Sequence, residues 1–204
     1  MELPLRRCII RSWRPGDSRE LASAANDRSV WINLRDRFPF PYRVTDAEAF
    51  IASSSAAVPE ANFAITVDGR VAGAIGLILG DDIYRASAQV GYWLGAAWRG
   101  QGIGTEALQG FSAWAFDAFP IVRLHAAVFT WNPPSARTLE KAGYTRESTA
   151  RQAAIKDGRI VDEWIYVRLR AEHQAATGGP PDELPDELPD EGPDELPGER
   201  AGEG

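Results

Sequence analysis

Three glycines within six residues constrain this chain more than any other feature. The segment Arg99-Gly100-Gln101-Gly102-Ile103-Gly104 follows an apolar stretch, residues 91–94, and precedes residues that share one helix face at three- and four-residue spacing. Glycine lets the backbone approach a ligand closely, and a helix N-terminus presents unpaired N–H groups with a partial positive charge. The turn therefore predicts either a phosphate site or a plain strand-to-helix connection, and the glycine spacing alone supports both equally.

Two other phosphate-binding loops are excluded by the same residues. No Gly-Lys-Ser/Thr follows, as a Walker loop requires, and Thr105 stands where the dinucleotide fingerprint needs glycine.

Hydrophobic patterning predicts a single α+β domain with a mixed sheet. Turn and cap signals predict helices opened by Asp17 and by Thr45, the second with Glu48 at its capping-box position. Gly91 predicts a bulge in its strand. We expect strands at 5–12, 62–67, 71–79, 86–94 and 123–129, two more around the Asp157-Gly158 turn, and further helices at 103–118 and from Pro133 to Gly143.

Charge divides the chain into two parts. The formal net charge is -7, but residues 178–204 hold ten acids and one arginine in repeats of Pro, Asp and Glu with Leu or Gly, whereas residues 1–177 carry +2. The repeat has too little apolar surface to offset chain entropy, so we expect a disordered acidic tail after a folded domain over 1–177. A charge of +2 is far from the basic surface of a nucleic-acid binder, which excludes that partner.

Composition also limits metal and membrane chemistry. One cysteine, Cys8, and two histidines, His125 and His173, exclude an internal disulfide and a Cys/His metal cluster, so we expect no metal. Alternation makes His125 a structural residue, and His173 is expected to be exposed. No apolar run approaches the roughly 20 residues that span a bilayer, and no signal peptide is present, so we expect a cytoplasmic protein without a membrane partner.

The residues around the glycine turn resemble one enzyme family. An RxxGxG turn after a GYWL strand, followed by Asn132, Ser135 and a helix ending in residues 141–144, resembles the GNAT superfamily of N-acetyltransferases. The early NLRDRFPFPY segment is similar to the branch of RimJ/RimL-like ribosomal-protein N-terminal acetyltransferases. The resemblance covers about residues 5–170 and implies a mixed, mostly antiparallel sheet of about seven strands flanked by helices. It implies acetyl-CoA as cosubstrate and an amine as acceptor.

The resemblance assigns the CoA pyrophosphate to the backbone N–H groups of the glycine turn. This set comprises Arg99, Gly100, Gln101, Gly102, Ile103 and Gly104, with Arg99 also supplying a cation. The pantetheine arm is implied to run along the strand backbone at Tyr92, Trp93 and Leu94, where an N–H group can stabilise an oxyanion. Core packing of the aromatic side chains is compatible with that contact.

The NxxS element supplies two candidate catalytic residues. Asn132 is either a helix cap, a cofactor contact or both. The resemblance places Ser135 near the cofactor sulfur, where it can donate a proton to the departing thiolate, although a serine there can equally bond to the backbone. Tyr144 is expected to pack in the core.

One position departs from the family pattern. Relatives often carry a glutamate base where this chain has Gln89, and a neutral amide cannot accept the amine proton. Either the amine arrives deprotonated, or Asp162 or Glu163 serves as the base, with alternation sending these two to opposite faces. We therefore expect a preference for amines of low pKa, such as peptide N-termini and α-amino groups.

The acceptor site is implied to lie between the first two helices, their connection and the last hairpin turn. The candidates are Trp31, Asn33, Arg35, Asp36, Phe38 and Tyr42, with residues 157–159 opposite. Such an aromatic, proline-bearing wall with mixed charges suits a peptide terminus, an α-amino group, a small-molecule amine or an antibiotic. Direct attack without a covalent enzyme intermediate is expected. The alternative is a non-catalytic acyl-CoA binding module with an acidic interaction tail, and a homodimer is possible because dimers are common among relatives.

Overall fold

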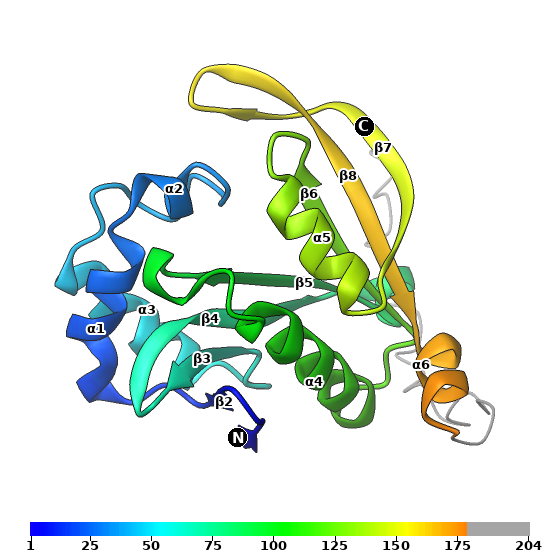
Figure 1. Cartoon of the computed structure of the whole chain (residues 1–204), viewed down its shortest axis with the longest axis horizontal. Helices are drawn as coiled ribbons and strands as arrows, with labels where there is room; N and C mark the ends of the chain where they lie inside the picture. The colour runs from blue at the N-terminus through cyan, green and yellow to red at the C-terminus, as the bar shows by residue number, and fades with distance from the viewer. Residues whose placement is uncertain (179–204) are drawn as a thin grey trace, which may run out of the picture.

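An open, twisted sheet with helices on both faces organises the chain in the computed structural model, which describes residues 1–178 (Figure 1). The strands are β1 (Glu2–Pro4), β2 (Ile9–Arg11), β3 (Asn62–Val67), β4 (Arg70–Leu79), β5 (Ser87–Leu94), β6 (Arg123–Phe129), β7 (Thr145–Lys156) and β8 (Arg159–Leu169). The helices are α1 (Ser18–Ala25), α2 (Arg28–Trp31), α3 (Val44–Ala56), α4 (Ile103–Ala118), α5 (Pro133–Lys141) and α6 (Arg170–Thr177), with short 3-10 turns η1 (Pro15–Asp17), η2 (Asp82–Tyr84) and η3 (Ala96–Trp98).

The strand order is β1-β2-β3-β4-β5-β6-β8-β7, and only β5 and β6 pair in parallel. The predicted mixed, mostly antiparallel sheet is confirmed, with eight strands in place of about seven. The tail predicted from residue 178 falls on residues 179–204, which lie outside the described residues.

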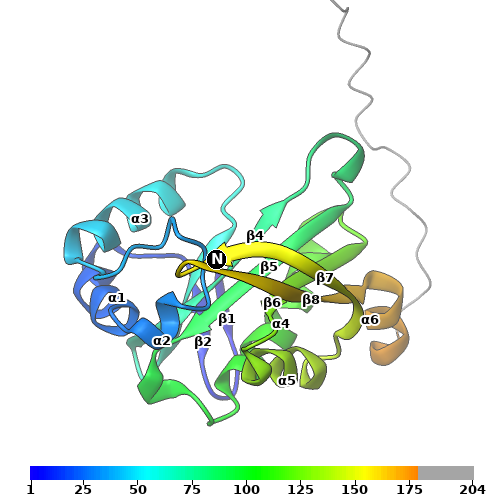
Figure 2. The same cartoon turned by 90° about the horizontal axis from the view of Figure 1, so that it is seen from above.

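Two apolar clusters fix the helices to opposite faces of the sheet, as Figure 2 shows from above. The larger cluster joins α4 and α5 to the sheet around Phe63, Phe111 and Tyr166, each at most 2% exposed. The smaller cluster joins α1 and α3 to the other face around Trp13 and Leu21. Burying each such side chain contributes about 1.5–3 kcal/mol, so both helical layers are held mainly by apolar contact.

The predicted strand at 5–12 is wrong in extent. The chain reverses there, since the Leu5 N–H donates to the Cys8 carbonyl over 2.9 Å, and the flanking segments pair as β1 and β2. The bulge predicted at Gly91 is also wrong, because Gly91 lies in regular register opposite Gly76 of β4. His173 is half-buried rather than exposed, since its ring stacks on Phe116 with centroids 5.7 Å apart.

Helix caps differ from the prediction in both early helices. α3 begins one residue before Thr45, and its capping acid is Asp46, which accepts from the Arg43 N–H, instead of Glu48. The Asp17 carboxylate does not cap α1 but pairs with the Arg11 guanidinium through bonds of 2.7 and 2.9 Å.

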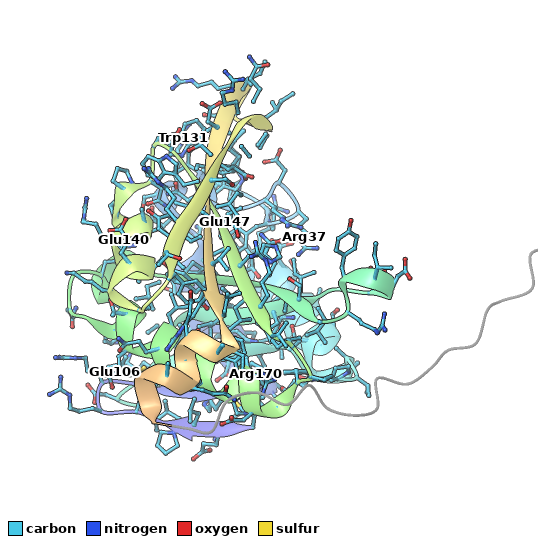
Figure 3. The ribbon with its side chains drawn as sticks, turned by 90° about the vertical axis from the view of Figure 1, so that its right-hand side faces the viewer. Arg37, Glu106, Trp131, Glu140, Glu147 and Arg170 are labelled. Atoms are coloured by element: carbon cyan, nitrogen blue, oxygen red, sulfur yellow. The ribbon has the colours of Figure 1, made fainter. Side chains whose placement is uncertain are left out.

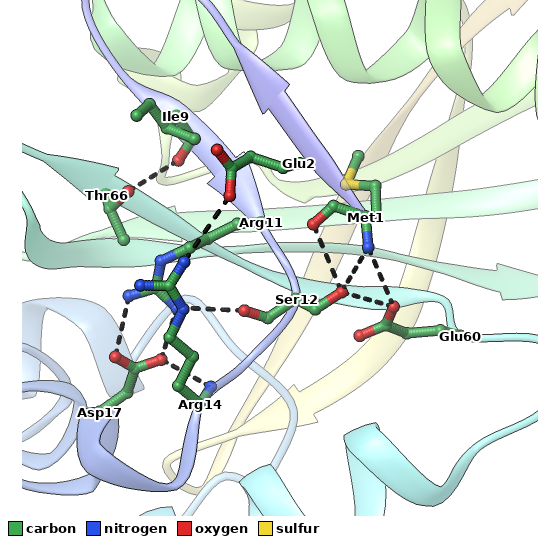
Figure 4. A network of polar contacts seen from close by, with 9 residues as sticks. All are labelled: Met1, Glu2, Ile9, Arg11, Ser12, Arg14, Asp17, Glu60 and Thr66. Atoms are coloured by element: carbon green, nitrogen blue, oxygen red, sulfur yellow. Dashed lines mark hydrogen bonds and ion pairs between the residues drawn. The ribbon is translucent and has the colours of Figure 1, made fainter.

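The Arg11–Asp17 pair is buried and connects β2 to the start of α1 (Figure 4). Burial opposes ionisation of Asp17, but hydrogen bonds from Arg11 and from the Arg14 N–H outweigh it and hold its pKa below the usual range. Beside this pair, the Ser12 hydroxyl donates to Glu60 over 2.7 Å. These contacts anchor the end of β2 to η1 before α1 and to the segment before β3.

Of the helices that the structure describes, none combines the length and the apolar character needed to cross a membrane.

Candidate active site

β5 and β6 separate partway along their length, and this separation defines the site. They pair only from Ser87 to Gln89 on β5 and from Arg123 to His125 on β6. Beyond this point β6 stays paired with β8 and β5 stays paired with β4, so β5 and β6 diverge (Figure 1). Among the described residues, the edge of β5 on the β6 side therefore has no strand partner from Val90 onward.

The register of β4 and β5 decides which backbone groups face this gap. Hydrogen-bonded and non-bonded pairs alternate in an antiparallel ladder, and the Gly95 N–H donates to the Ala72 carbonyl of the bonded set. Trp93, two residues before Gly95, is also in the hydrogen-bonded set, so its N–H and carbonyl groups bond to β4. Tyr92 and Leu94 direct their main-chain N–H and carbonyl groups away from β4, and the Leu94 carbonyl accepts from Arg99 Nε over 2.9 Å. Of the three predicted main-chain contacts, Tyr92 and Leu94 are suitably placed, and Trp93 is not.

The glycine turn forms the start of α4, beside the end of β5. Gly100 and Gly102 have φ of 74° and 79°, a region that L side chains rarely adopt. A Cβ at Gly104 would lie 3.4 Å from Leu94 Cδ1. No side chain caps the helix at Gly102 within the part of the chain that the structure describes. The first N–H groups of α4 are thus open to an acceptor from outside the protein.

Neighbouring side chains hold the turn in place. Arg99 Nη1 donates to Ser29 Oγ over 2.8 Å, so this cation joins the turn to α2 in addition to its bond with β5. Gln101 Nε2 donates to the Ala97 carbonyl over 2.8 Å. Behind the turn, Glu106 accepts from the Arg7 N–H over 2.9 Å, and Figure 3 shows Glu106 at the base of the molecule.

Asn132 and Ser135 lie across the gap from β5, at the start of α5. Asn132 Oδ1 accepts from the Ser135 N–H over 3.4 Å, so the residue caps α5 as predicted. The Ser135 hydroxyl lies 3.0 Å from Tyr92 Oη, which also donates to the Ser135 carbonyl over 3.2 Å. Burial raises the pKa of Tyr92 to about 12, so this phenol stays protonated at neutral pH. Sequence reasoning missed the pair, because its members are 43 residues apart.

Gln89 is bonded to a cation from the other side of the site. Arg35 Nη2, from the segment between α2 and α3, donates to Gln89 Oε1 over 2.6 Å. Glu163 on β8 lies near Arg35, and burial raises the pKa of its carboxyl against the influence of that arginine. Asp162 is used elsewhere, since its Oδ1 accepts from the Gln152 N–H over 2.7 Å at a bulge in β7. Of the two candidate bases, Glu163 is the one that faces Arg35.

His125 sits on the same sheet face as Gln89, its partner on β5. Burial lowers the pKa of its imidazole, and Nδ1 has no hydrogen-bond partner within residues 1–178. A neutral ring in this position agrees with the structural role predicted for it.

The β7–β8 hairpin closes over the predicted acceptor wall. Its tip bonds to the α2 region through Asp157, which accepts from Arg28 over 2.6 Å, and through Lys156, which donates to Asp36 over 2.7 Å. The Lys156 ammonium lies 3.8 Å from the centre of the Trp31 ring, and its side chain is only 1% exposed. The sequence reading named the turn but missed Lys156, which no local pattern marks as buried.

The other acceptor candidates differ in environment: one is hydrogen-bonded at the surface, and the others pack against aromatic neighbours. Asn33 Oδ1 accepts from Trp131 Nε1 over 3.2 Å, and Figure 3 shows Trp131 high beside the hairpin. The Phe38 ring packs at a tilt on Tyr42, with centroids 4.6 Å apart, and edge-to-face on Trp93, with centroids 5.7 Å apart. Tyr42 is 5% exposed within the smaller core cluster, so its substrate-contact role stays a prediction while its packing role is observed.

Across residues 1–178, no three Cys, His, Asp or Glu side chains gather into a group that could hold a metal ion.

Comparisons with known proteins agree with this geometry. YjcK of Bacillus subtilis, described as a probable N-acetyltransferase, is 38% identical over 110 residues, covering 52% of this chain and 59% of that relative. RimJ of Mycobacterium smegmatis, in complex with CoA-disulfide, has a TM-score of 0.75 at 23% identity over 87% of this chain and 94% of its own. RimL, a ribosomal L7/L12 alpha-N-protein acetyltransferase in complex with coenzyme A, has a TM-score of 0.73 at 19% identity over 83% and 98%.

The two structural matches show a shared fold, and the match to YjcK spans just over half of that relative. The sequence model described as the acetyltransferase (GNAT) domain matches residues 7–145, well over half of the 204 residues. The chain therefore belongs to the GNAT acetyltransferase family.

Proposed function

We propose that this protein transfers the acetyl group of acetyl-CoA to an α-amine, as at a peptide N-terminus. The observation that carries the proposal is the start of α4, which has no side-chain cap, beside the edge of β5 that β6 leaves unpaired among the described residues. The Ser135 hydroxyl lies at the same edge, in contact with the hydroxyl of Tyr92 on β5. Solved relatives of this fold include RimJ with CoA-disulfide and RimL with coenzyme A, and RimL is described as acting on an α-amine.

The residues present fit a CoA diphosphate. The N–H groups of Ile103, Gly104 and the preceding turn suit phosphate oxygens, and positive φ at Gly100 and Gly102 aligns that backbone. The mildly positive charge of residues 1–177 suits an anionic ligand. When bound, acetyl-CoA supplies the reactive thioester carbonyl.

Groups of the protein are placed to stabilise charge and move protons. The N–H groups of Tyr92 and Leu94 are suitable donors to a developing oxyanion. Ser135 holds a hydroxyl proton supported by Tyr92 and is suited to protonate a leaving thiolate. Glu163 is suited to take the amine proton, because burial raises the pKa of its carboxyl toward the range of an effective base.

The free energy of amine deprotonation favours an α-amine as acceptor. At pH 7, deprotonation costs about 4.6 kcal/mol for a lysine side chain of pKa near 10.4, but about 1.4 kcal/mol for an α-amine near 8. Gln89 lacks the carboxylate that relatives often place there, which leaves less help for a high-pKa amine. A site without a carboxylate at position 89 therefore prefers α-amines, which cost less free energy to deprotonate.

Direct attack by the amine agrees with the chemistry of the thiol. Cys8 is 4% exposed, and burial together with Glu106 raises its pKa to about 11, so little thiolate forms at neutral pH. A covalent acetyl-cysteine step has no reactive residue among those that the structure describes.

Release of thiol from acetyl-CoA, measured with and without a panel of amines, tests the proposal. We expect release that depends on an α-amine and that is lost in Gly102→Glu, whose carboxylate repels a diphosphate. Gly102→Ala is the matched control, because it introduces the same backbone strain without the charge. Tight binding of acetyl-CoA with no amine-dependent release would favour the non-catalytic binding module, which the comparisons do not support.

A further inference from the structure

Three cations face the acceptor side of the site, and one of them lacks a carboxylate partner. Arg28 is paired with Asp157 at 2.6 Å, and Lys156 is paired with Asp36 at 2.7 Å. Each of these pairs holds the hairpin tip against the α2 region and is close to neutral as a unit. Arg35, in the segment between α2 and α3, forms no ion pair within residues 1–178, although it lies near Glu163 of β8.

Arg35 is instead held by a neutral group. Its Nη2 donates to Gln89 Oε1 over 2.6 Å, the one hydrogen bond of the guanidinium among the described residues. A guanidinium has five N–H donors, so most of its donor capacity is left over. Glu163 is near enough to interact with Arg35 electrostatically, but the two do not form an ion pair in the described part of the chain. The positive charge of Arg35 is thus oriented but not neutralised.

The place of Gln89 puts this charge beside the expected position of the reacting amine. Gln89 is the last β5 residue that pairs with β6, so it stands where the two strands part. A glutamate at this position would pair with Arg35 and cancel its charge, whereas glutamine fixes the guanidinium and leaves the charge available.

We infer that Arg35, oriented by Gln89, selects acceptors that carry a carboxylate close to the reacting amine. The inference rests on the proposed function and names its substrate class. Two sources can supply such a carboxylate: the side chain of an acidic first residue in a peptide, or the α-carboxylate of a free amino acid. Arg35 is a specificity-determining residue in this reading, because charge-assisted hydrogen bonds to a guanidinium are strong and directional.

Matched acceptors measure this selection directly. One arm compares Asp-Ala-Ala amide with Asn-Ala-Ala amide, which differ in charge at almost constant shape, and the other compares free alanine with alaninamide. We expect wild-type kcat/KM to favour the carboxylate-bearing member of at least one arm by about tenfold or more, mainly through KM. The arm that shows the preference identifies the source.

Three variants assign the preference to its cause. Arg35→Gln removes the cation, and Gln89→Glu neutralises it in place, so both should lower the kcat/KM of the carboxylate-bearing member relative to its neutral partner by about tenfold or more in the arm that shows the preference. Arg37→Gln, which removes an exposed arginine from the same segment, is the matched control and should leave the ratio unchanged. Thermal melting of each variant confirms that it is folded.

The outcomes separate this inference from the proposed function. Acetylation of these acceptors without a preference in either arm would overturn the selection by Arg35 and leave the proposed function standing. A preference that survives Arg35→Gln, or that falls equally in Arg37→Gln, would also overturn it. No thiol release with any amine would overturn the proposed function itself.

Discussion

The contact between Ser135 and Tyr92 allows the sharpest test of the proton-donor role. Ser135 Oγ and Tyr92 Oη are 3.0 Å apart, and Tyr92 Oη also reaches the Ser135 carbonyl. A positioned general acid typically contributes 10²–10⁴-fold, and a thiol of pKa near 8.5 is already a good leaving group, which favours the lower end. We predict that Ser135→Ala lowers kcat about 100-fold, roughly 2.7 kcal/mol, with little change in KM for acetyl-CoA.

Tyr92→Phe removes the hydroxyl that contacts both the Ser135 hydroxyl and the Ser135 carbonyl, and loss of the contact with the Ser135 hydroxyl, about 1 kcal/mol, should lower kcat about fivefold. Once Ser135 is alanine, the Tyr92 hydroxyl has no serine hydroxyl to support, so the kcat of the double variant should match that of Ser135→Ala alone. Single-turnover thiol release gives these rates without interference from product release.

A second hydroxyl pair in the core is a matched control. Ser112 Oγ lies 2.7 Å from Tyr144 Oη, and both groups are buried in the contact between α4 and the start of β7. Ser112→Ala and Tyr144→Phe should each lower the free energy of unfolding by about 1 kcal/mol and leave kcat unchanged. A kcat for Ser135→Ala within twofold of wild type would refute the proton-donor role. If the two substitutions lower kcat independently, so that their fold-changes multiply in the double variant, Tyr92 does not act through Ser135.

Three other predictions follow from the site and its support. Calorimetry should show that Gly102→Glu loses CoA affinity by at least tenfold more than Gly102→Ala, and equal affinities would mean that the diphosphate lies elsewhere. Arg11→Ala should lower the free energy of unfolding by about 3–5 kcal/mol, because it leaves a buried carboxylate unpaired. Since the pKa of Asp17 is lowered in the folded state, this stability is present above its unfolded value near 3.9 and is lost as pH falls further, so denaturation curves of wild type and Arg11→Ala should converge in acid. Glu163→Gln should lower kcat/KM about 100-fold and remove the acid limb of the wild-type pH profile. That limb lies above pH 4.5 because burial raises the pKa of the Glu163 carboxyl, and an unchanged limb would exclude Glu163 as the base.

Local patterns in the sequence were sufficient to predict the helix and strands around the candidate cofactor site. The strand at 123–129 and the helix at 103–118 have the predicted bounds, because their apolar periodicity is unbroken and a glycine turn or an Asn-Pro cap marks the adjoining boundary. The cap role of Asn132 was predicted for the same reason.

Contacts that a local sequence pattern does not reveal account for the side-chain roles that the sequence could not predict. Asp17 looks like a helix cap, but a buried arginine six residues earlier takes its carboxylate. Lys156 looks like a solvated turn residue, yet Trp31 and Asp36, more than 100 residues away, bury it. Gln89 looked like a missing base, and only the fold shows that it binds Arg35. In each case a partner that the local pattern does not identify decides the role of a polar side chain.

The most direct measurement uses one peptide that has both a free N-terminus and an internal lysine. The peptide is incubated with acetyl-CoA and either wild type, Gly102→Ala or Gly102→Glu, and tandem mass spectrometry locates the added acetyl group. We predict acetylation of the α-amine by wild type, a lower but detectable level with Gly102→Ala, and none above background with Gly102→Glu. Acetylation mainly on the lysine, or equal α-amine acetylation by Gly102→Glu and wild type, would contradict transfer to an α-amine from a cofactor held at the start of α4.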